Sequence, residues 1–462
     1  STYIFLRYLM QPSGKRLVAA GIGFGIAELL KFSLVLLIPF FFLLALHPWV
    51  TAFLRHPGPN AARRYADTKS LLRKQVGAFL SVVGIGFLLV YLLYAVFITN
   101  YPMEKQLSDT LTIFENHEPR WPIDATTWMI QHPLTRPIAH YLSGLFVVLS
   151  HLVSGHLVYF FSVVSENGWW FYFPLVFFIK EPLPSLLLLG LAALLGLRAS
   201  YTFVLRARAH RKLPAHIDAY FPEFAMAFFI AIYWVISAGS SLNIGIRHTL
   251  PTLPFIYLIA TGLLKAWAEH RQDLKKRNTE DIARRPARRH LLLRLLIAAL
   301  LVWYFAETLA AAPYFLSYFN QLGGGVWNGY RFVVDSNYDC GQDLKRFTSW
   351  IQEYNRTASD PIHKIAIDYF GGGSPRYYLG SVGVEAEHWW PARGNPKEQG
   401  FEWFAVSVSS LQGGLGKTAR GYVRKPADEY TWLVELKGRP DRFGEVPEPE
   451  YRIGTSIFLY RL

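Results

Sequence analysis

Cysteine is nearly absent from this chain, which has one, Cys340, among 462 residues. A single cysteine excludes an internal disulfide and any cysteine-based metal cluster. The sequence also lacks an HExxH zinc motif, a serine nucleophile elbow and a phosphate-binding glycine loop. Metalloprotease, serine hydrolase and nucleotide-binding chemistry therefore find no support in its motifs.

Charged residues are also scarce, at 17% of the chain, whereas hydrophobic residues make up 52% and aromatic residues 16%. Arranged in long apolar blocks, this composition is typical of a multi-span membrane protein. The net charge is +14, but the lysines and arginines lie mainly between the blocks, as in cytoplasmic loops. The expected partners are therefore membrane lipids, and nucleic acid is not among them.

Five apolar segments are predicted to span the membrane because each approaches the roughly 20 residues that a span requires. They are 76–98, 170–197, 223–238, 252–268 and 291–312. The stretch 17–46 is too long for one span and has Glu28 and Lys31 near its middle. It is predicted to form a hairpin of two short helices.

The sidedness of the chain follows from three basic loops, 55–74, 206–212 and 271–290, which the positive-inside rule places in the cytoplasm. With these loops fixed, an odd number of crossings cannot fit between 76–98 and 170–197. The apolar segment 140–161 is therefore predicted to lie at the outer interface, or to dip into the membrane and return, along a wet, irregular path.

The fold predicted is a multi-span α-helical membrane body with a small extracytoplasmic α/β domain. The membrane domain is placed at 1–312, with an extracytoplasmic loop at 99–169, and the α/β domain at 313–462. In the latter, alternating β-branched and aromatic residues predict strands, and helical spacing predicts one helix. The strands are expected at 364–370, 404–411 and 455–462, and the helix at 341–355.

Four stretches of the chain together resemble one family, the polyprenyl-phosphate-dependent membrane glycosyltransferases related to the protein O-mannosyltransferases, family 39 of the GT-C superfamily. They are AGIGFGIAELLKFSLVLLIPF (20–40), GWWFYFPLVFFIKEPLPSLLLL (168–189), SLNIGIRHTLPTLPF (241–255) and YFNQLGGGVWNGYRFVVDSNYDCGQDLKRF (318–347). The resemblance implies a GT-C-like membrane body. It also implies a polyprenyl-phosphate-linked sugar as donor.

In that family an acidic residue in the first extracytoplasmic loop serves as the general base, and the loop precedes the stretch that resembles 20–40. The residues before position 20 include no Asp or Glu. Either the chain lacks the first helices of the family or the base has moved to another position, and the first alternative is favoured. The catalytic base is therefore unassigned and is expected to lie N-terminal to this chain.

Two motifs supply candidate ligands for the donor phosphate. Lys180 is a cation near the outer end of a predicted span, where a polyprenyl phosphate head would lie and where a fixed positive charge would stabilise the departing phosphate. Arg247 can grip a phosphate bidentately, and His248 beside it can exchange a proton near neutral pH. The alternatives are that Lys180 snorkels to the interface and pairs with Glu181, and that 243–251 is an ordinary interfacial loop.

Candidate acceptor or sugar contacts are five polar side chains near the presumed reaction surface: Asp109, Tyr172, Asp335, Asn337 and Asp339. The stretch 335–343 begins like a calcium loop, but Cys340 stands at the sixth position and Arg346 at the twelfth. A turn into the following helix, capped by Asp339, is favoured over a metal site. No metal and no cofactor are predicted, and assistance by a divalent ion stays open.

The function predicted is the inverting transfer of a sugar from a polyprenyl-phosphate donor to a protein, lipid or glycan acceptor. The protein is expected to be a multi-pass component of the plasma (inner) membrane with its C-terminal domain extracytoplasmic. The alternatives are a transporter or flippase for lipid-linked sugars and a non-catalytic membrane assembly protein. A transporter commonly shows repeated topology, and none is visible in this sequence.

Overall fold

The structure is a computed structural model that describes residues 1–55, 61–115, 117–154, 156–205, 217–277, 285–440 and 442–462. The chain divides into two compact units. The first unit comprises Ser1–Ser154 and Ser200–Ala231, and the second comprises Gly155–Ala199 and Ile232–Leu462. The predicted division at residue 312 into a membrane and an extracytoplasmic domain stays a prediction.

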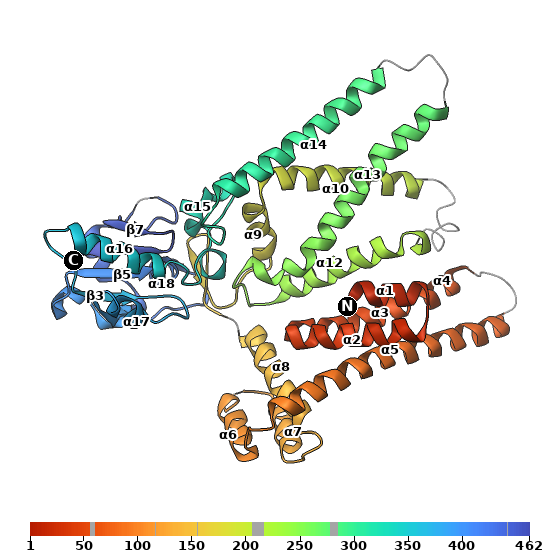
Figure 1. The fold of residues 1–462 in the computed structure, drawn as a ribbon, viewed down its shortest axis with the longest axis horizontal. Coiled ribbons are helices and arrows are strands. Elements are labelled where there is room, and N and C mark those ends of the chain that lie inside the picture. Colours follow the sequence, from red (N-terminus) through yellow and green to blue (C-terminus); the bar gives the residue numbers. More distant parts are fainter. Residues whose placement is uncertain (56–60, 116, 155, 206–216, 278–284, 441) are drawn as a thin grey trace. The chain divides into compact units, whose positions relative to one another are not determined.

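The first unit is helical throughout the described part of its N-terminal segment (Figure 1). Its helices are α1 (Thr2–Met10), α2 (Gly14–Leu30), α3 (Leu37–Ala45), α4 (His47–Arg55), α5 (Ala61–Phe97), α6 (Met103–Ile113), α7 (Trp121–Ile130) and α8 (Arg136–Ser154), with a 3-10 turn η1 at Phe32–Leu36. Lys31 has extended backbone angles, φ −161° and ψ 120°. This break confirms that 17–46 forms two helices.

Helices α2 and α5 pack closely because small residues line their contact. A Cβ atom at Gly25 would lie 2.6 Å from the carbonyl oxygen of Gly86, and one at Gly21 would lie 2.6 Å from Ile85. Glycines spaced four residues apart on one helix face allow two backbones to approach in this way. The glycines of the stretch 20–40 therefore have a packing role.

The segment 140–161 differs from its prediction. Its first part belongs to α8, a continuous helix whose Tyr141 is fully buried and donates a hydrogen bond to Glu28 (2.8 Å). The aromatic side chains of Phe32 and Phe87 pack around Tyr141. The expectation of an irregular path was wrong for this part, because one face of helix α8 packs against α5 and η1 and is joined to Glu28 of α2 by the buried hydrogen bond of Tyr141.

The second unit contains two sheets and the remaining helices (Figure 1). Its strands are β1 (Val158–Phe160), β2 (Val163–Ser165), β3 (Lys364–Asp368), β4 (Glu385–His388), β5 (Trp403–Ser407), β6 (Lys417–Thr418), β7 (Tyr451–Ile453) and β8 (Ile457–Arg461). Its α-helices are α9 (Tyr172–Lys180), α13 (Leu253–Arg277), α14 (Arg285–Ala310), α15 (Gly325–Asn328), α16 (Leu344–Thr357), α17 (Pro375–Gly380), α18 (Val408–Leu415) and α19 (Thr431–Lys437). Helices α10 (Leu183–Leu205) and α12 (Phe221–Gly239) contribute residues to both units.

Short 3-10 turns connect these elements. They are η2 (Ile246–His248), η3 (Leu250–Thr252), η4 (Gln321–Gly323), η5 (Gly329–Arg331), η6 (Asp335–Asn337), η7 (Pro391–Arg393), η8 (Pro396–Gln399) and η9 (Pro426–Asp428). Two of them, η2 and η6, contact each other and lie in the stretches singled out from the sequence.

The larger sheet has the strand order β4-β3-β5-β8-β7, with β4, β3 and β5 parallel and β8 antiparallel to both β5 and β7. The predicted strands at 364–370 and 455–462 and the helix at 341–355 are confirmed as β3, β8 and α16. The stretch 404–411 is only half strand, because the chain turns into α18 at Val408.

Side chains of the larger sheet alternate between two cores, as the two-residue period of a strand requires. On β5, Trp403 and Ala405 join the core under α16 and α17, whereas Phe404 and Val406 join the opposite core. That opposite core continues into α9, whose Tyr172 and three apolar neighbours belong to it. Residues 158–179 are therefore built into the same packed body as the C-terminal sheet.

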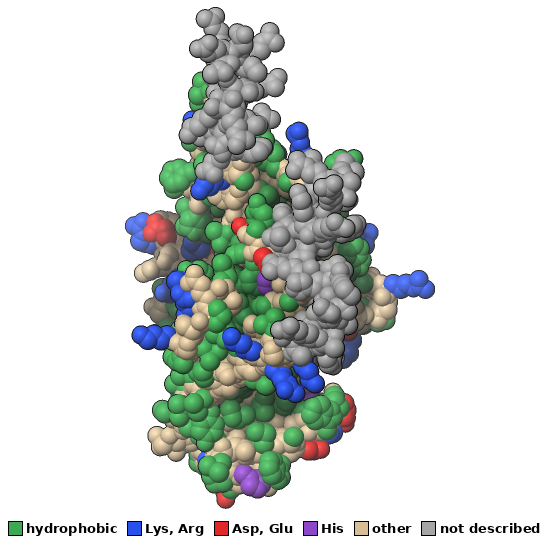
Figure 2. Space-filling view, turned by 90° about the vertical axis from the view of Figure 1, so that its right-hand side faces the viewer, with side chains coloured by type: hydrophobic (Ala, Val, Ile, Leu, Met, Phe, Trp, Pro, Cys, Tyr) green, Lys and Arg blue, Asp and Glu red, His purple; other side chains and the backbone are tan. Residues whose placement is uncertain are grey.

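Five segments are long and apolar enough to cross a membrane: Phe32–Ala52, Lys69–Phe97, Leu183–Tyr201, Phe221–Gly239 and Leu250–Trp267. Between 11% and 33% of each apolar window is buried within the chain, so most of this surface is open to a surrounding apolar medium. Figure 2 shows hydrophobic side chains over much of the viewed surface. These properties indicate a membrane-associated protein.

The predicted span 170–197 begins later than expected. Helix α9 ends at Lys180, Glu181 takes an extended conformation (ψ 133°), and α10 begins at Leu183. Pro182 follows Glu181 directly, and the residue before a proline is driven out of the helical region. Lys180 therefore lies at the C-terminus of a separate short helix, outside the apolar span.

Candidate functional site

Three of the stretches singled out from the sequence meet in the second unit. Helix α9 lies in 168–189, η2 in 241–255 and η6 in 318–347, and both α9 and η6 contact η2. The meeting point is Asn337, which is fully buried. Positions up to 165 residues apart in the sequence are joined here by hydrogen bonds.

Asn337 connects all three segments through its own polar atoms. Its Oδ1 accepts a hydrogen bond from the backbone N–H of Ile246 (2.9 Å), and its Nδ2 donates to the hydroxyl of Tyr172 (2.7 Å). Its backbone carbonyl accepts from the ammonium of Lys180. Because a buried polar group left unpaired is costly, these contacts fix the three segments in one arrangement.

Lys180 is held by backbone carbonyls. Its Nζ donates to the carbonyls of Leu316 (2.9 Å) and Asn337, and lies 4.5 Å from the centre of the Phe319 ring. Burial lowers the pKa of Lys180 to about 7. Within the described residues no carboxylate lies at ion-pair distance from this ammonium.

The alternative interpretation that Lys180 pairs with Glu181 is wrong. The carboxylate of Glu181 instead accepts a hydrogen bond from the hydroxyl of Tyr257. Glu181 also begins the extended connection to α10, so its side chain leaves the axis of α9. The cation of Lys180 thus lies among carbonyl dipoles without an acidic partner in the described chain.

Arg247 is exposed and lies in the turn η2, beside the half-buried His248. Burial raises the pKa of the Cys340 thiol, and the positive charges of Arg247 and Lys180 act against that rise. The two predicted phosphate ligands are therefore within electrostatic range of one side chain. Among the described residues, the Arg247 guanidinium has no ion-pair partner.

Three residues of the loop 335–339 were predicted to contact an acceptor or sugar. Of these, Asp335 has a partly exposed carboxylate, with 24% of its side-chain surface accessible. Its Oδ2 lies 3.6 Å from Nε2 of His156, and its backbone N–H donates to Ser409 Oγ (3.1 Å). The hydrogen bond to Asp335 raises the pKa of His156. Asp335 also has φ +57°, a left-handed conformation that is uncommon outside glycine and is found at functional sites.

Tyr172, Asn337 and Asp339 are almost completely buried, so they support the loop and do not present a surface to an acceptor. The turn predicted for 335–343 is confirmed, but its cap is not Asp339. Asp339 Oδ1 accepts from the backbone N–H of Gly341 (2.9 Å), while Asp343 occupies the position before α16. The Asp343 carboxylate accepts hydrogen bonds from the backbone N–H groups of Thr455 and Ser456.

The loop 335–343 lies at the carboxyl ends of the parallel strands. Ser409 follows β5 and binds Asp335, while Tyr369 follows β3 and donates to the carbonyl of Gly341 (2.8 Å). The chain passes from β3 to β4 on one side and then to β5 on the other, so β3 and β5 flank the point where the strand order reverses. Ligands of open α/β sheets bind beside such a point.

Asp109 lies in α6 of the first unit and has local partners. The hydroxyl of Tyr101 donates to its Oδ2 (2.5 Å), and Lys105 lies 3.5 Å away. The hydrogen bond from Tyr101 is the main cause of the lowered pKa of Asp109. A contact with an acceptor stays a prediction for this residue.

Two members of these clusters were missed by the sequence analysis. His156 was not singled out within the segment 140–161, and Glu28 was noted only as a charged residue near the middle of an apolar stretch. Their partners, Asp335 and Tyr141, are 179 and 113 residues away in the sequence, and no local pattern links such positions. Within the described residues, no group of three His, Cys, Asp or Glu side chains is placed to hold a metal ion.

Comparison of the chain with known proteins returns no matching family model, curated protein or solved structure.

Proposed function

We propose that this chain belongs to the GT-C-like glycosyltransferases that it resembles and transfers a sugar from a polyprenyl-phosphate donor. The acceptor lies on the extracytoplasmic face of the plasma (inner) membrane, and transfer inverts the sugar carbon. The observation that carries the proposal is that three of the resembling stretches meet around Asn337. The positive charges of Lys180 and Arg247 both act on the pKa of the Cys340 thiol in this region. The apolar helices support the lipid character of the donor.

In this proposal the two cations have different tasks at the donor phosphate. Arg247 is exposed and can bind two phosphate oxygens in parallel. Lys180 has three N–H donors and gives two of them to carbonyls, so one remains for a ligand. Negative charge grows on the phosphate as the sugar departs, and fixed cations stabilise that state more than the bound donor.

The activity is tested with the intact protein in membranes and a labelled polyprenyl-phosphate sugar. Arg247→Ala is expected to lower kcat/KM by about tenfold or more, the effect of losing charge-assisted hydrogen bonds. Arg247→Lys keeps the charge but loses the bidentate geometry, so it should fall between the wild type and Arg247→Ala. Arg376→Ala removes an exposed arginine from the second unit and is the matched control.

The pH profile of transfer tests Lys180 separately. With a pKa of about 7, the charged fraction of this lysine falls about tenfold between pH 6 and pH 8, and kcat/KM should fall with it. Lys180→Arg stays charged throughout and should remove this step from the profile. Unchanged transfer in both Lys180→Ala and Arg247→Ala would refute the phosphate site, and movement of the lipid-linked sugar without transfer would favour a flippase.

A further inference from the structure

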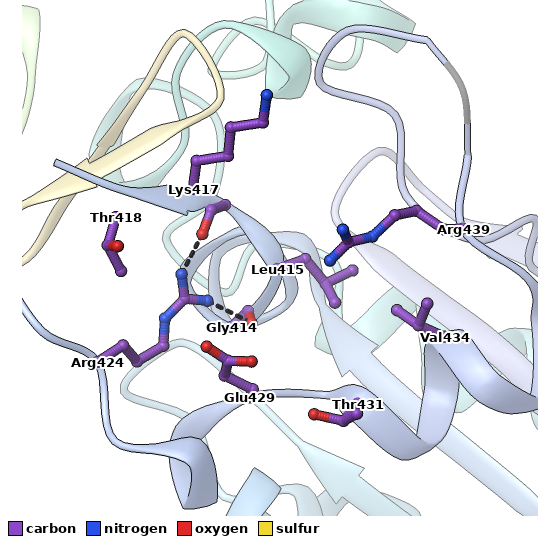
Figure 3. Close-up of a pocket in the computed structure, with 10 residues that line it drawn as sticks. Gly414, Leu415, Lys417, Thr418, Arg424, Glu429, Thr431, Val434 and Arg439 are labelled. Atoms are coloured by element: carbon purple, nitrogen blue, oxygen red, sulfur yellow. Dashed lines mark hydrogen bonds between the residues drawn. The ribbon is translucent and has the colours of Figure 1, made fainter.

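A cavity of about 370 Å³ lies in the second unit, between the end of α18, strand β6 and helix α19 (Figure 3). Its lining includes three cations, Lys417, Arg424 and Arg439, but only one carboxylate, Glu429. Two threonine hydroxyls, from Thr418 and Thr431, complete its polar lining. The cavity is large enough for a small organic ligand and has an excess of positive charge.

Arg424 is the unusual member of this lining, because only 8% of it is exposed. Its two terminal nitrogens donate to the carbonyls of Gly414 and Gly416, which fixes the plane of the guanidinium. Its Nε has no hydrogen-bond partner, and no described carboxylate lies at ion-pair distance. Carbonyl dipoles satisfy N–H groups but carry no net charge, so the buried positive charge has no carboxylate in direct contact with it.

A second guanidinium lies across the cavity from the first. Figure 3 shows Arg439 pointing toward the side of the cavity where Arg424 lies, with the Glu429 carboxylate beside Arg424 and Lys417 extending away. Arg439 is exposed and has no ion-pair partner among the described residues. Two guanidinium groups that converge on one space are suited to an oxyanion, because arginine binds phosphate and carboxylate through paired N–H groups.

We propose that this cavity binds a sugar that carries an oxyanion, either a sugar phosphate or a sugar acid. Arg424 and Arg439 take the anionic group, and the hydroxyls of Thr418 and Thr431 with the Glu429 carboxylate take sugar hydroxyls. The site is separate from the proposed donor-phosphate site at Lys180 and Arg247. Its occupation is measured by binding alone, so this inference stands or falls independently of sugar transfer.

The test is a calorimetric titration of the intact, detergent-solubilised protein with four probes: glucose 6-phosphate, glucuronate, inorganic phosphate and glucose. Saturable binding of glucose 6-phosphate or glucuronate is expected, with glucose at least about tenfold weaker because it lacks the charged group. Equal binding of glucose and the anionic sugars would overturn the proposal. Binding of inorganic phosphate as tight as that of glucose 6-phosphate would overturn the sugar part.

Variants then locate the binding. Arg439→Gln should lower the affinity for the anionic sugars about tenfold, because it removes one guanidinium from the cavity without disturbing a buried contact. Glu429→Gln keeps an oxygen that can accept from a sugar hydroxyl but removes the one negative charge of the lining, so it should tighten binding of the anionic sugars. Lys345→Gln, an exposed lysine on α16, is the matched control and should leave it unchanged. Equal affinity of wild type and Arg439→Gln would refute the site, and this surface variant avoids the risk that a change at buried Arg424 unfolds the domain.

Discussion

The buried carboxyl group of Asp339 should make the stability of this protein depend on pH. Asp339 is fully buried, and desolvation raises its pKa from 3.8 to about 7, with the neighbouring charge of Asp343 acting in the same direction. The backbone N–H of Gly341 and the hydroxyls of Ser456 and Ser407 oppose this rise but do not cancel it.

The sign of the effect follows from the two pKa values. The native state binds the proton more tightly than the unfolded chain, so the stabilisation is fully present below pH 3.8 and is lost as the pH rises through about 7. Each pH unit in this window lowers the free energy of unfolding by about 1.4 kcal/mol, which gives an upper limit of ~4 kcal/mol. Asp339→Asn keeps an oxygen for the Gly341 N–H and cannot ionise.

The expected result is therefore a variant whose stability advantage over the wild type is largest at pH 8, smaller at pH 5 and absent below about pH 3.8. Thermal unfolding of the detergent-solubilised protein, followed by intrinsic fluorescence at several pH values, measures this difference. Asp428→Asn, at an exposed position of the same unit, is the control and should follow the wild type. The reasoning is refuted if Asp339→Asn loses as much stability between pH 5 and pH 8 as the wild type does.

Three further changes test the packing around the buried polar groups. Asn337→Ala leaves the Tyr172 hydroxyl and the backbone N–H of Ile246 without their partners and should lower the free energy of unfolding by about 2–5 kcal/mol. Thermal unfolding measures this loss as a lowered midpoint. An unchanged midpoint would mean that Asn337 does not join the three segments. Tyr141→Phe removes the donor to buried Glu28 and should cost about 1–3 kcal/mol, whereas Tyr91→Phe on α5, as control, should cost little. Gly86→Val should force α2 and α5 apart and increase proteolysis of the first unit; resistance equal to the wild type would contradict the close contact.

Much of the fold could be predicted because its signals are local. Alternating apolar residues marked β3 and β8, and the helical spacing of Leu344, Phe347 and Ile351 marked the buried face of α16. Pro182 and Pro184 are local signals for the break between α9 and α10. The break was not predicted, because the long apolar run around these prolines was interpreted as one span. Apolar content alone does not distinguish one span from a short helix followed by a longer one.

The arrangement of the candidate site could be predicted only in part. The sequence indicated which stretches carry unusual polar residues, but the hydrogen bonds of Asn337 to Tyr172 and Ile246 depend on how distant segments pack. The same limit applied to Asp339, which was predicted as a helix cap. The residue that precedes α16 is Asp343. Its carboxylate accepts hydrogen bonds from the backbone N–H groups of Thr455 and Ser456, in the turn before β8, and local spacing cannot reveal such a distant contact.

Lys180 makes contacts that an apolar residue such as leucine could not make at the same position. A leucine could fill the volume, but the carbonyls of Leu316 and Asn337 would lose the donor that now joins them to α9. Those two hydrogen bonds alone do not require a charge, since a neutral amine could also donate them. The positive charge costs free energy at a site whose surroundings lower the lysine pKa to about 7. That cost is offset when a negative group binds nearby, so a partly buried cation without an acidic partner in the described chain is better suited to an anionic ligand than to an empty site.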